Sequence, residues 1–202
     1  MIVRLETLKD FFEVETLIRE AFWNVYQPGC DEHLVAHKLR NDASFVPSLD
    51  YVVEEAGAII GSIFYAEGKL IDDKGNDIPG LLFGPVAVSP AYQHQGIGQH
   101  LIEFSMQKAT ELGYPFILIT GNPAYYCKFG FTPASQYGIH LEGIDRNDEA
   151  PFFMIKILDE TKIIPLGIFH HPSCYVVTKE ELDLFEKQFP YKEKKVLPGQ
   201  LR

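Results

Sequence analysis

The chain has 202 residues, 46% of them hydrophobic and 23% charged, and a formal net charge of −10. These values are typical of one folded globular domain of ordinary size, and they disfavour a nucleic-acid-binding protein, because phosphate recognition along a nucleic acid needs clustered Lys and Arg. The basic cluster at 192–195 is small and lies near the end of the sequence.

Membrane and secreted proteins are also disfavoured. No apolar run approaches the roughly 20 residues that cross a bilayer, and the first ten residues carry charges where a signal peptide has its apolar centre. The three cysteines, Cys30, Cys127 and Cys174, are odd in number and widely spaced, which is not typical of a disulfide framework or a zinc site. We therefore expect a cytoplasmic protein with no metal ion and no membrane or nucleic-acid partner.

Periodicity predicts the elements of the first part. Apolar residues from Phe11 to Phe22 recur at helical spacing, with Thr7 as the expected helix cap and Asp10 in the first turn. In chain order we expect a strand at 2–5, this helix, a second helix over about 31–40, and a hairpin of strands at 51–54 and 58–65.

The later part continues the alternation of strands and helices. After a polar turn at 72–77 we expect a strand over about 80–88, a helix of about 16 residues that ends at Gly113, and a strand at 115–120. One or two helical turns should follow at 123–129, and then strands at 152–158 and 175–177. Thr178 should open a last helix with a capping box, and this helix should run to about 189. This order predicts a mixed α/β fold with one sheet and helices on both of its sides.

The segment from Gln93 to Gly98 joins a strand to a helix start and carries two glycines. Glycine adopts positive φ easily and lets the backbone approach a ligand closely, and a helix start adds unpaired N–H groups and the positive end of the helix dipole. We therefore expect a phosphate-bearing ligand here. Two nucleotide loops do not fit, because no Lys follows Gly98 and Leu101 stands where a dinucleotide fingerprint needs a third glycine.

The chain carries Gln93-x-x-Gly96-x-Gly98 after Val86-Ala-Val88, and Tyr126-x-x-x-Gly130-Phe131 after the next strand. Both motifs resemble those of the GNAT superfamily of acyl-CoA N-acyltransferases. The order of elements from Met1 to about Phe131 resembles the family as well. The run Gly121-Asn-Pro-Ala-Tyr-Tyr126 is similar to a bacterial branch of predicted N-acetyltransferases.

The resemblance implies a GNAT-like α/β fold. Its central mixed sheet is expected to be mostly antiparallel and to splay between the strands at 80–88 and 116–120, with helices on both sides. Residues 1–134 would form the acyl-CoA-binding N-acyltransferase core. Residues 135–202 would be an extension of the same structural domain that completes the sheet and shapes the acceptor pocket.

The resemblance also implies acetyl-CoA as the acyl donor and a small-molecule or protein amine as the acceptor, with monomer and homodimer both left open. The backbone at the strand end would pair with the pantetheine arm, and the loop N–H groups would hold the pyrophosphate. The residues assigned to the donor are Val86, Ala87, Val88, Gln93, His94, Gln95, Gly96, Ile97, Gly98, Gln99 and Asn122. For His94 an exposed loop position is the better interpretation of the side chain, and Asn122 stands closer to the tyrosine than the family pattern has it.

Tyr126 occupies the position of the family's general acid, which protonates the expelled thiolate. Transfer from an ordinary Tyr, of pKa near 10, to a thiolate whose acid has a pKa near 8.5 is uphill by about 2 kcal/mol. Hydrogen bonding to the sulfur is therefore the main role expected for Tyr126. Packing under the loop is the alternative, and it is favoured for the neighbouring Tyr125.

No general base follows from the sequence. An amine of pKa about 10.4 is neutral in only about one molecule in 2,500 at pH 7, so something must take its proton. Many relatives use a Glu on the strand before the loop, where this chain has 81–83 Leu-Leu-Phe. The remaining candidates are better explained as ordinary surface residues: Glu54, Glu67, His33 and His37. We expect Cys127 to pack rather than to act as a nucleophile, and His170-His171 to lie in a solvated turn.

Three functions stay open on these grounds. The first is an acyl-CoA-dependent N-acetyltransferase that works by direct attack in a ternary complex. The second is a non-catalytic module that binds or senses acyl-CoA, which the unassigned base favours. The third is an interaction domain with a decayed site, which the intact glycines of the 93–98 loop disfavour.

Overall fold

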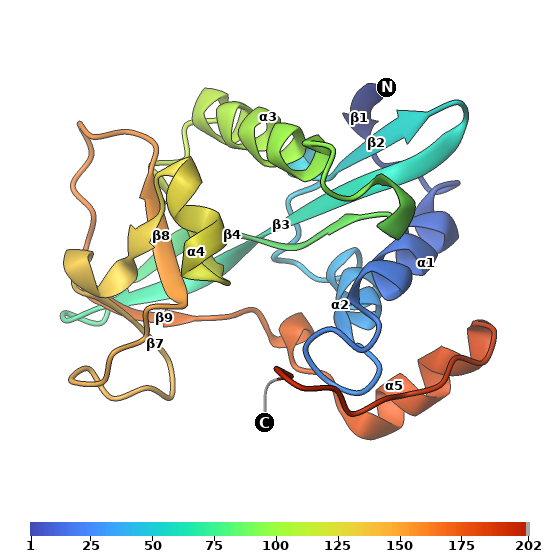
Figure 1. The fold of residues 1–202 in the computed structure, drawn as a ribbon. Helices are drawn as coiled ribbons and strands as arrows, with labels where there is room; N and C mark the ends of the chain where they lie inside the picture. Colours follow the sequence, from blue (N-terminus) through green and yellow to red (C-terminus); the bar gives the residue numbers. More distant parts are fainter. Residues whose placement is uncertain (201–202) are drawn as a thin grey trace. The chain divides into compact units, whose positions relative to one another are not determined.

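The computed structural model describes residues 1–200 (Figure 1). The helices are α1 (Phe11–Phe22), α2 (Glu32–Leu39), α3 (Ile97–Glu111), α4 (Pro123–Tyr126) and α5 (Lys179–Phe185). The strands are β1 (Ile2–Leu5), β2 (Tyr51–Glu55), β3 (Ala58–Asp72), β4 (Asp77–Val88), β5 (Phe116–Thr120), β6 (Thr132–Pro133), β7 (Ile139–Leu141), β8 (Phe153–Ile157) and β9 (Gly167–His170). Within residues 1–200, no helix is both long enough and apolar enough to cross a membrane.

The chain forms two compact units, each built from segments that are distant in sequence. Unit 1 contains residues 1–64, 85–102 and those from Ser173 onward, and unit 2 contains 65–84 and 103–172. The strands β3 and β4 and the helix α3 run from one unit into the other. By hydrogen bonding, the strands are neighbours in the order β1-β2-β3-β4-β5-β8-β6, and β9 pairs with β3 and β7.

Unit 1 is built on the antiparallel strands β1, β2 and the start of β3, with α1 and α2 on one face (Figure 1). The predicted hairpin is present because Ala56 and Gly57 both adopt positive φ, 51° and 84°, as a tight turn between twisted strands requires. The start of α1 differs from the prediction. The helix begins at Phe11, and Asp10 takes the capping position, where its carboxylate accepts bonds from the N–H and hydroxyl of Thr7.

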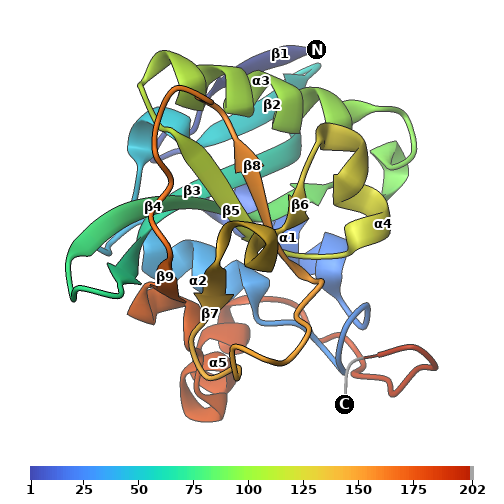
Figure 2. The same cartoon turned by 90° about the vertical axis from the view of Figure 1, so that its left-hand side faces the viewer.

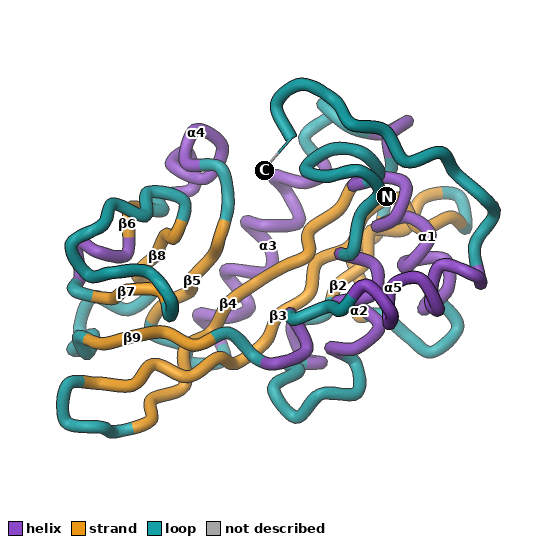
Figure 3. Tube along the Cα trace, turned by 90° about the horizontal axis from the view of Figure 1, so that it is seen from below, coloured by secondary structure: helices purple, strands orange, loops and turns teal. Residues whose placement is uncertain are grey.

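Unit 2 holds the end of β3, most of β4 and the strands from β5 to β9. The strand β5 is parallel to β4 and antiparallel to β8, which lies beside it in Figure 2. The strand β7 is parallel to β9, and the two lie side by side in Figure 3. All residues of β5 except Thr120 are buried, which confirms that both faces of this apolar strand are covered. Pairing between β4 and β5 is recorded at Leu81 and Leu82, after which β4 runs on to Val88. The predicted mixed α/β fold with a mostly antiparallel sheet is therefore confirmed.

Two predictions for the later part were wrong. The residues from Ser173 to Tyr175 form a short 3-10 helix rather than a strand. In this helix Cys174 is buried, whereas Val176 after it is exposed, and the Val176 carbonyl oxygen accepts a hydrogen bond from Lys38 Nζ instead of from a neighbouring strand. His170 is the last residue of β9 rather than part of a turn. Its strand can pair with β3 because Gly167 lets the two backbones meet, where a Cβ would clash with the Ile71 carbonyl oxygen.

Unit 1 buries a cluster of charged side chains. The Arg40 guanidinium contacts Glu6 Oε1 and Glu15 Oε1 at 2.6 Å each, and the side chains of all three residues are at most 5% exposed. Asp50 lies in the same cluster, where burial and the Glu6 carboxylate raise its pKa to about 9. The cluster therefore disfavours the ionised form of Asp50, beside the Arg40 guanidinium and its two carboxylate partners.

The segment after α5 is fastened to α1. Arg19 donates to both carboxylate oxygens of Glu186 and to the Pro190 carbonyl oxygen, and the Trp23 indole donates to the Glu193 carbonyl oxygen at 3.0 Å. Beside these bonds, the side chains that pack between α2 and α5 form an apolar cluster: Leu34, Phe185, Phe189, Val177 and Leu182. Residues that are more than 150 positions apart in the sequence thus complete the core of unit 1.

Candidate functional site

The loop that follows β4 is held in place at both of its ends. Ser89 N–H donates to the Ile60 carbonyl oxygen at 2.9 Å, and a 3-10 turn over Pro90–Tyr92 follows. At the other end the buried side chain of Ile97, the first residue of α3, packs over Gly61 of β3, where an added Cβ would lie 3.4 Å from it. The residues between these anchors, 93–96, are therefore positioned by the strand before them and the helix after them.

The loop presents a row of backbone donors. Among the residues that the structure describes, the N–H groups of residues 93–98 make no hydrogen bond to a protein acceptor. The first helical bond of α3 runs from His100 N–H to the Gly96 carbonyl oxygen at 2.9 Å. Six consecutive donors thus lie at the positive end of a 15-residue helix, an arrangement that favours an anion.

Two loop residues adopt left-handed backbone conformations. The φ angle of His94 is 61° and that of Gly96 is 83°. A Cβ added to Gly96 would meet no atom within 4 Å, so the space beside this residue is open. Glycine is favoured here because of its backbone angle, and a side chain at this position would extend into open space.

The loop glutamines bond to the protein itself. Gln93 Nε2 donates to the Val88 carbonyl oxygen at 3.1 Å, and Gln95 Nε2 donates to the Ala91 carbonyl oxygen at 3.3 Å. The sequence predicts these residues only as parts of the donor site and gives no sign of these bonds. The backbone of β4 that was predicted to bind the donor, 86–88, therefore has its last carbonyl oxygen already engaged by Gln93.

The predicted donor-site residues fall into two groups. The β4 end and the loop belong to unit 1, where Ala87 and Ile97 have buried side chains and the exposed ones are those of His94, Gln95 and Gln99. Asn122 and Tyr126 belong to unit 2.

Tyr126 lies at the end of α4, within a cluster of aromatic rings. Its half-buried ring is 5.8 Å from that of Phe83 and 6.0 Å from that of Phe131, both edge to face. A Cβ on Gly121 would lie 2.3 Å from the Tyr126 ring, so the glycine before α4 makes room for it. Asn122 caps α4, because its Oδ1 accepts a bond from Ala124 N–H at 3.0 Å.

The Tyr-x-x-x-Gly-Phe motif has a structural explanation of its own. The 3-10 turn at Cys127–Phe129 ends at Gly130, whose φ of 81° suits glycine, and the next residue, Phe131, is 1% exposed. Gly130 therefore turns the chain out of the helical segment, and Phe131 anchors it in the core. Together they fix the position of Tyr126 four residues earlier.

The candidate bases differ in their surroundings. His33 is fully buried rather than a surface residue, and burial lowers its pKa to about 4. The other three lie nearer the surface and have partners: the Glu54 carboxylate accepts from Arg4 Nε, the Glu67 carboxylate from the Tyr114 hydroxyl, and His37 Nδ1 lies 2.9 Å from Glu15 Oε1. The structure therefore does not identify any of these four residues as the general base.

Glu32 is a titratable residue that the sequence did not single out. It stands at the start of α2, and burial raises its pKa to about 7, which leaves it able to gain or lose a proton near neutrality. Burial is the only signal that marks it, and the residue type and spacing give none.

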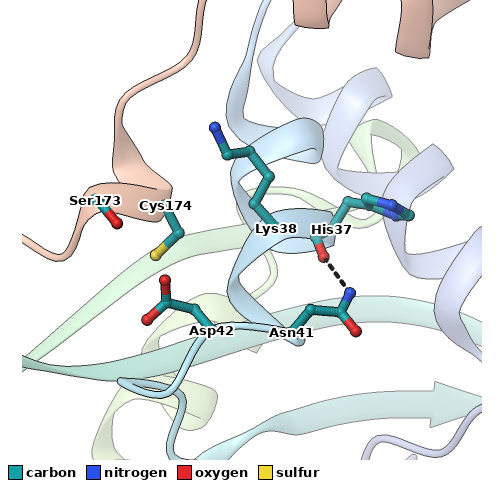
Figure 4. Close-up of a pocket in the computed structure, with 6 residues that line it drawn as sticks. All are labelled: His37, Lys38, Asn41, Asp42, Ser173 and Cys174. Atoms are coloured by element: carbon teal, nitrogen blue, oxygen red, sulfur yellow. Dashed lines mark hydrogen bonds between the residues drawn. The ribbon is translucent and has the colours of Figure 1, made fainter.

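A hollow of about 500 Å³ in unit 1 lies between α2 and the segment before α5 (Figure 4). Its lining residues are His37, Lys38, Asn41, Asp42, Ser173 and Cys174. The His37 ring points away from the Cys174 thiol in Figure 4, and burial together with Asp42 raises the pKa of that thiol to about 11. The hollow therefore lacks an activated nucleophile. Cys127, which was expected to pack, is exposed.

Residues 48–133 match the family model of the acetyltransferase (GNAT) domain. The chain is 27% identical over 139 residues to the N-acetyltransferase YhbS of Escherichia coli K12, an alignment that covers 69% of this chain and 78% of the relative. The structure of Escherichia coli YhbS in complex with CoA superposes with a TM-score of 0.73 at 23% identity, over 86% of this chain and 91% of that one. A GNAT family acetyltransferase from Brucella melitensis in complex with acetyl-CoA gives a TM-score of 0.68 at 22% identity, over 87% and 97%.

The family match spans the hairpin, the 93–98 loop and the Tyr126 motif, and the superpositions show that the fold is that of GNAT acetyltransferases. Residues 48–133 are therefore similar in sequence to GNAT acetyltransferase domains, and the chain has the GNAT fold.

Proposed function

We propose that this protein is an N-acetyltransferase that moves an acetyl group from acetyl-CoA to a primary amine by direct attack in a ternary complex. The observation that carries the proposal is the row of backbone N–H donors at 93–98 beside the open space at Gly96. The solved relatives in complex with CoA and with acetyl-CoA support the same donor.

In this proposal the loop holds the pyrophosphate. The helix-end field alone contributes about 0.3–1 kcal/mol, so the converging N–H groups of residues 93–98, each in a charge-assisted bond, supply most of the affinity. The backbone of Val86 and Val88 pairs with the amides of the pantetheine arm, with Val88 N–H nearest the thioester. The residues Ala87, Ile97, Gly98, Gln99 and Asn122 remain proposed members of the donor site.

The chemistry is an acyl transfer between sulfur and nitrogen. The neutral amine attacks the thioester carbon, the carbonyl oxygen gains negative charge, and the carbon–sulfur bond then breaks to release the thiolate of CoA. A backbone N–H near Val88 stabilises the oxyanion. Tyr126 donates a hydrogen bond to the sulfur, and the amine's proton leaves through a base or a water chain that is not assigned.

The acceptor and the surroundings of the site belong to the same proposal. The acceptor is a small-molecule or protein amine, and residues 135–202 extend the 1–134 core and shape the acceptor pocket. The extension contributes β8, which pairs with β5 along its whole length. We place the protein in the cytoplasm because its three cysteines are free thiols, which suits a reducing compartment.

The first test is a thermal-shift titration with acetyl-CoA. At a ligand concentration one hundred times Kd, the free energy of unfolding should rise by about 2.7 kcal/mol. For a chain of this size the melting temperature should rise by roughly 5–10 °C. The absence of a shift in well-folded protein would contradict acetyl-CoA as the donor.

Replacing Tyr126 by phenylalanine tests the catalytic role. The rate of acetyl transfer, measured as the release of free thiol, should fall by roughly 10- to 100-fold, because the thiolate loses its hydrogen-bond donor. The affinity for acetyl-CoA should stay nearly unchanged. The matched control is Tyr125→Phe, on the adjacent residue, which should leave turnover unchanged. Equal turnover in wild type and Tyr126→Phe would remove Tyr126 from the mechanism.

The unassigned base keeps one second function in view, a module that binds acyl-CoA without turnover. It predicts the thermal shift without thiol release for any amine. The measurement that separates the two is therefore thiol release over a panel of amines, carried out on protein that shows the shift.

A further inference from the structure

We infer that Gln93 and Gln95 are positioning residues whose side chains hold the 93–98 loop in shape for the donor pyrophosphate, while the backbone makes the contacts. This inference rests on the proposed function. It assigns the two carboxamide groups to the protein and leaves the N–H groups of the same residues to the ligand.

The first support is the direction of the two side-chain bonds. Gln93 Nε2 reaches back five residues to the Val88 carbonyl oxygen, and Gln95 Nε2 reaches back four residues to the Ala91 carbonyl oxygen. Each bond ties the loop to the segment that leads into it. Both are made by the NH₂ end of the carboxamide, because a carbonyl oxygen can only accept.

The second support is the residue between the two glutamines. His94 has a φ of 61°, a left-handed conformation that residues with a Cβ adopt rarely. It lies on an exposed loop with no buried side chain of its own to hold it there. The bonds of Gln93 before it and Gln95 after it supply restraint on both sides, so we infer that they keep His94 in this conformation.

The third support is electrostatic. The two glutamines bind the carbonyl oxygens of Val88 and Ala91, while the N–H groups of residues 93–98 have no protein acceptor among the described residues. Two acceptors near the loop are therefore engaged, and the N–H donors of residues 93–98 remain. This division of the loop's polar groups favours an anion over a cation or a neutral ligand.

The test is a double-mutant cycle between Gln93 and His94, with acetyl-CoA affinity measured by calorimetry. Gln93→Met keeps the length of the side chain and removes the donor, and it should weaken binding about tenfold. In a His94→Gly background the same change should weaken binding less than about threefold, because glycine adopts positive φ without support.

Gln95→Met provides a second, independent variant with the same expectation. The control is Gln107→Met on α3, which removes a comparable bond, from Gln107 Nε2 to Glu111 Oε1, and should leave affinity unchanged. Melting temperatures without ligand, close to that of the wild type, establish that each variant is folded.

Equal losses from Gln93→Met in the wild-type and His94→Gly backgrounds would overturn the inference, since they are what a direct contact between the Gln93 side chain and the phosphates would give. Unchanged affinity in both Gln93→Met and Gln95→Met would overturn it as well. A wild-type protein that does not bind acetyl-CoA would instead refute the proposed function, and the inference with it.

Discussion

Replacing Gly96 by glutamate is expected to abolish acetyl-CoA binding while the protein stays folded. The new side chain would extend from a φ of 83° into the open space beside the loop donors, where its carboxylate would take the place of the pyrophosphate and repel it. In the thermal-shift titration the rise of roughly 5–10 °C expected for the wild type should vanish.

The matched control for this variant is Gly75→Glu. Gly75 has the same φ of 83° and the same open surroundings, but it lies in the turn between β3 and β4. It separates the backbone strain of a substitution at positive φ from the effect on the ligand. If Gly96→Glu kept the full shift, or if Gly75→Glu lost it equally, the loop would not be the pyrophosphate site.

Replacing Arg40 by methionine is expected to have the largest effect on stability of any single change in the charged cluster of unit 1. Glu6 and Glu15 would be left buried without their cation, because the side chains of both are at most 5% exposed. Removing one partner of a buried ion pair costs about 3–5 kcal/mol. The substitution would also remove the stacking of the Arg40 guanidinium, whose carbon lies 4.1 Å from the centroid of the Phe11 ring.

Urea unfolding of the two proteins at pH 7 measures this difference. The control is Lys69→Met, which breaks an exposed ion pair with Asp77 and should cost no more than about 1 kcal/mol. A loss below about 1 kcal/mol for Arg40→Met would mean that the cluster is hydrated or that the carboxylates take up protons when Arg40 is absent.

Features that depend on neighbours in the sequence were predictable. The hairpin at Ala56-Gly57, the helix after Gly96 and the capping box at Thr178 each combine a turn or cap residue with a local apolar pattern, and the structure confirms all three. The family motifs of the loop and of Tyr126 belong to this class as well, since each lies within a few residues of chain.

Features that depend on distant residues were not predictable. The cluster of Arg40 with Glu6, Glu15 and Asp50 joins four segments, and nothing in the spacing of these residues shows that they meet. The burial of His33 has the same origin, because Phe185 and Phe189, which pack on its ring, come from beyond β9. The bonds of Gln93 and Gln95 are local, but they were not predictable either, because each side chain could equally well have bonded to a ligand as to the protein backbone.

The assembly of unit 1 from separate segments of the sequence has a consequence for folding during synthesis on the ribosome. This unit needs both residues 1–64 and the segment from Ser173 onward, whose Glu186 and Glu193 bond to α1 and to Trp23 after it. The ribosome makes all of unit 2 between these two pieces. More than a hundred further residues must therefore be synthesised after residue 64 before the last segment that packs on α1 is made. At about 5–20 residues per second, this takes many seconds. During that interval the apolar face of α1 and the ring of Trp23 are without their final cover, which makes this the stage of synthesis at which a chaperone would matter most.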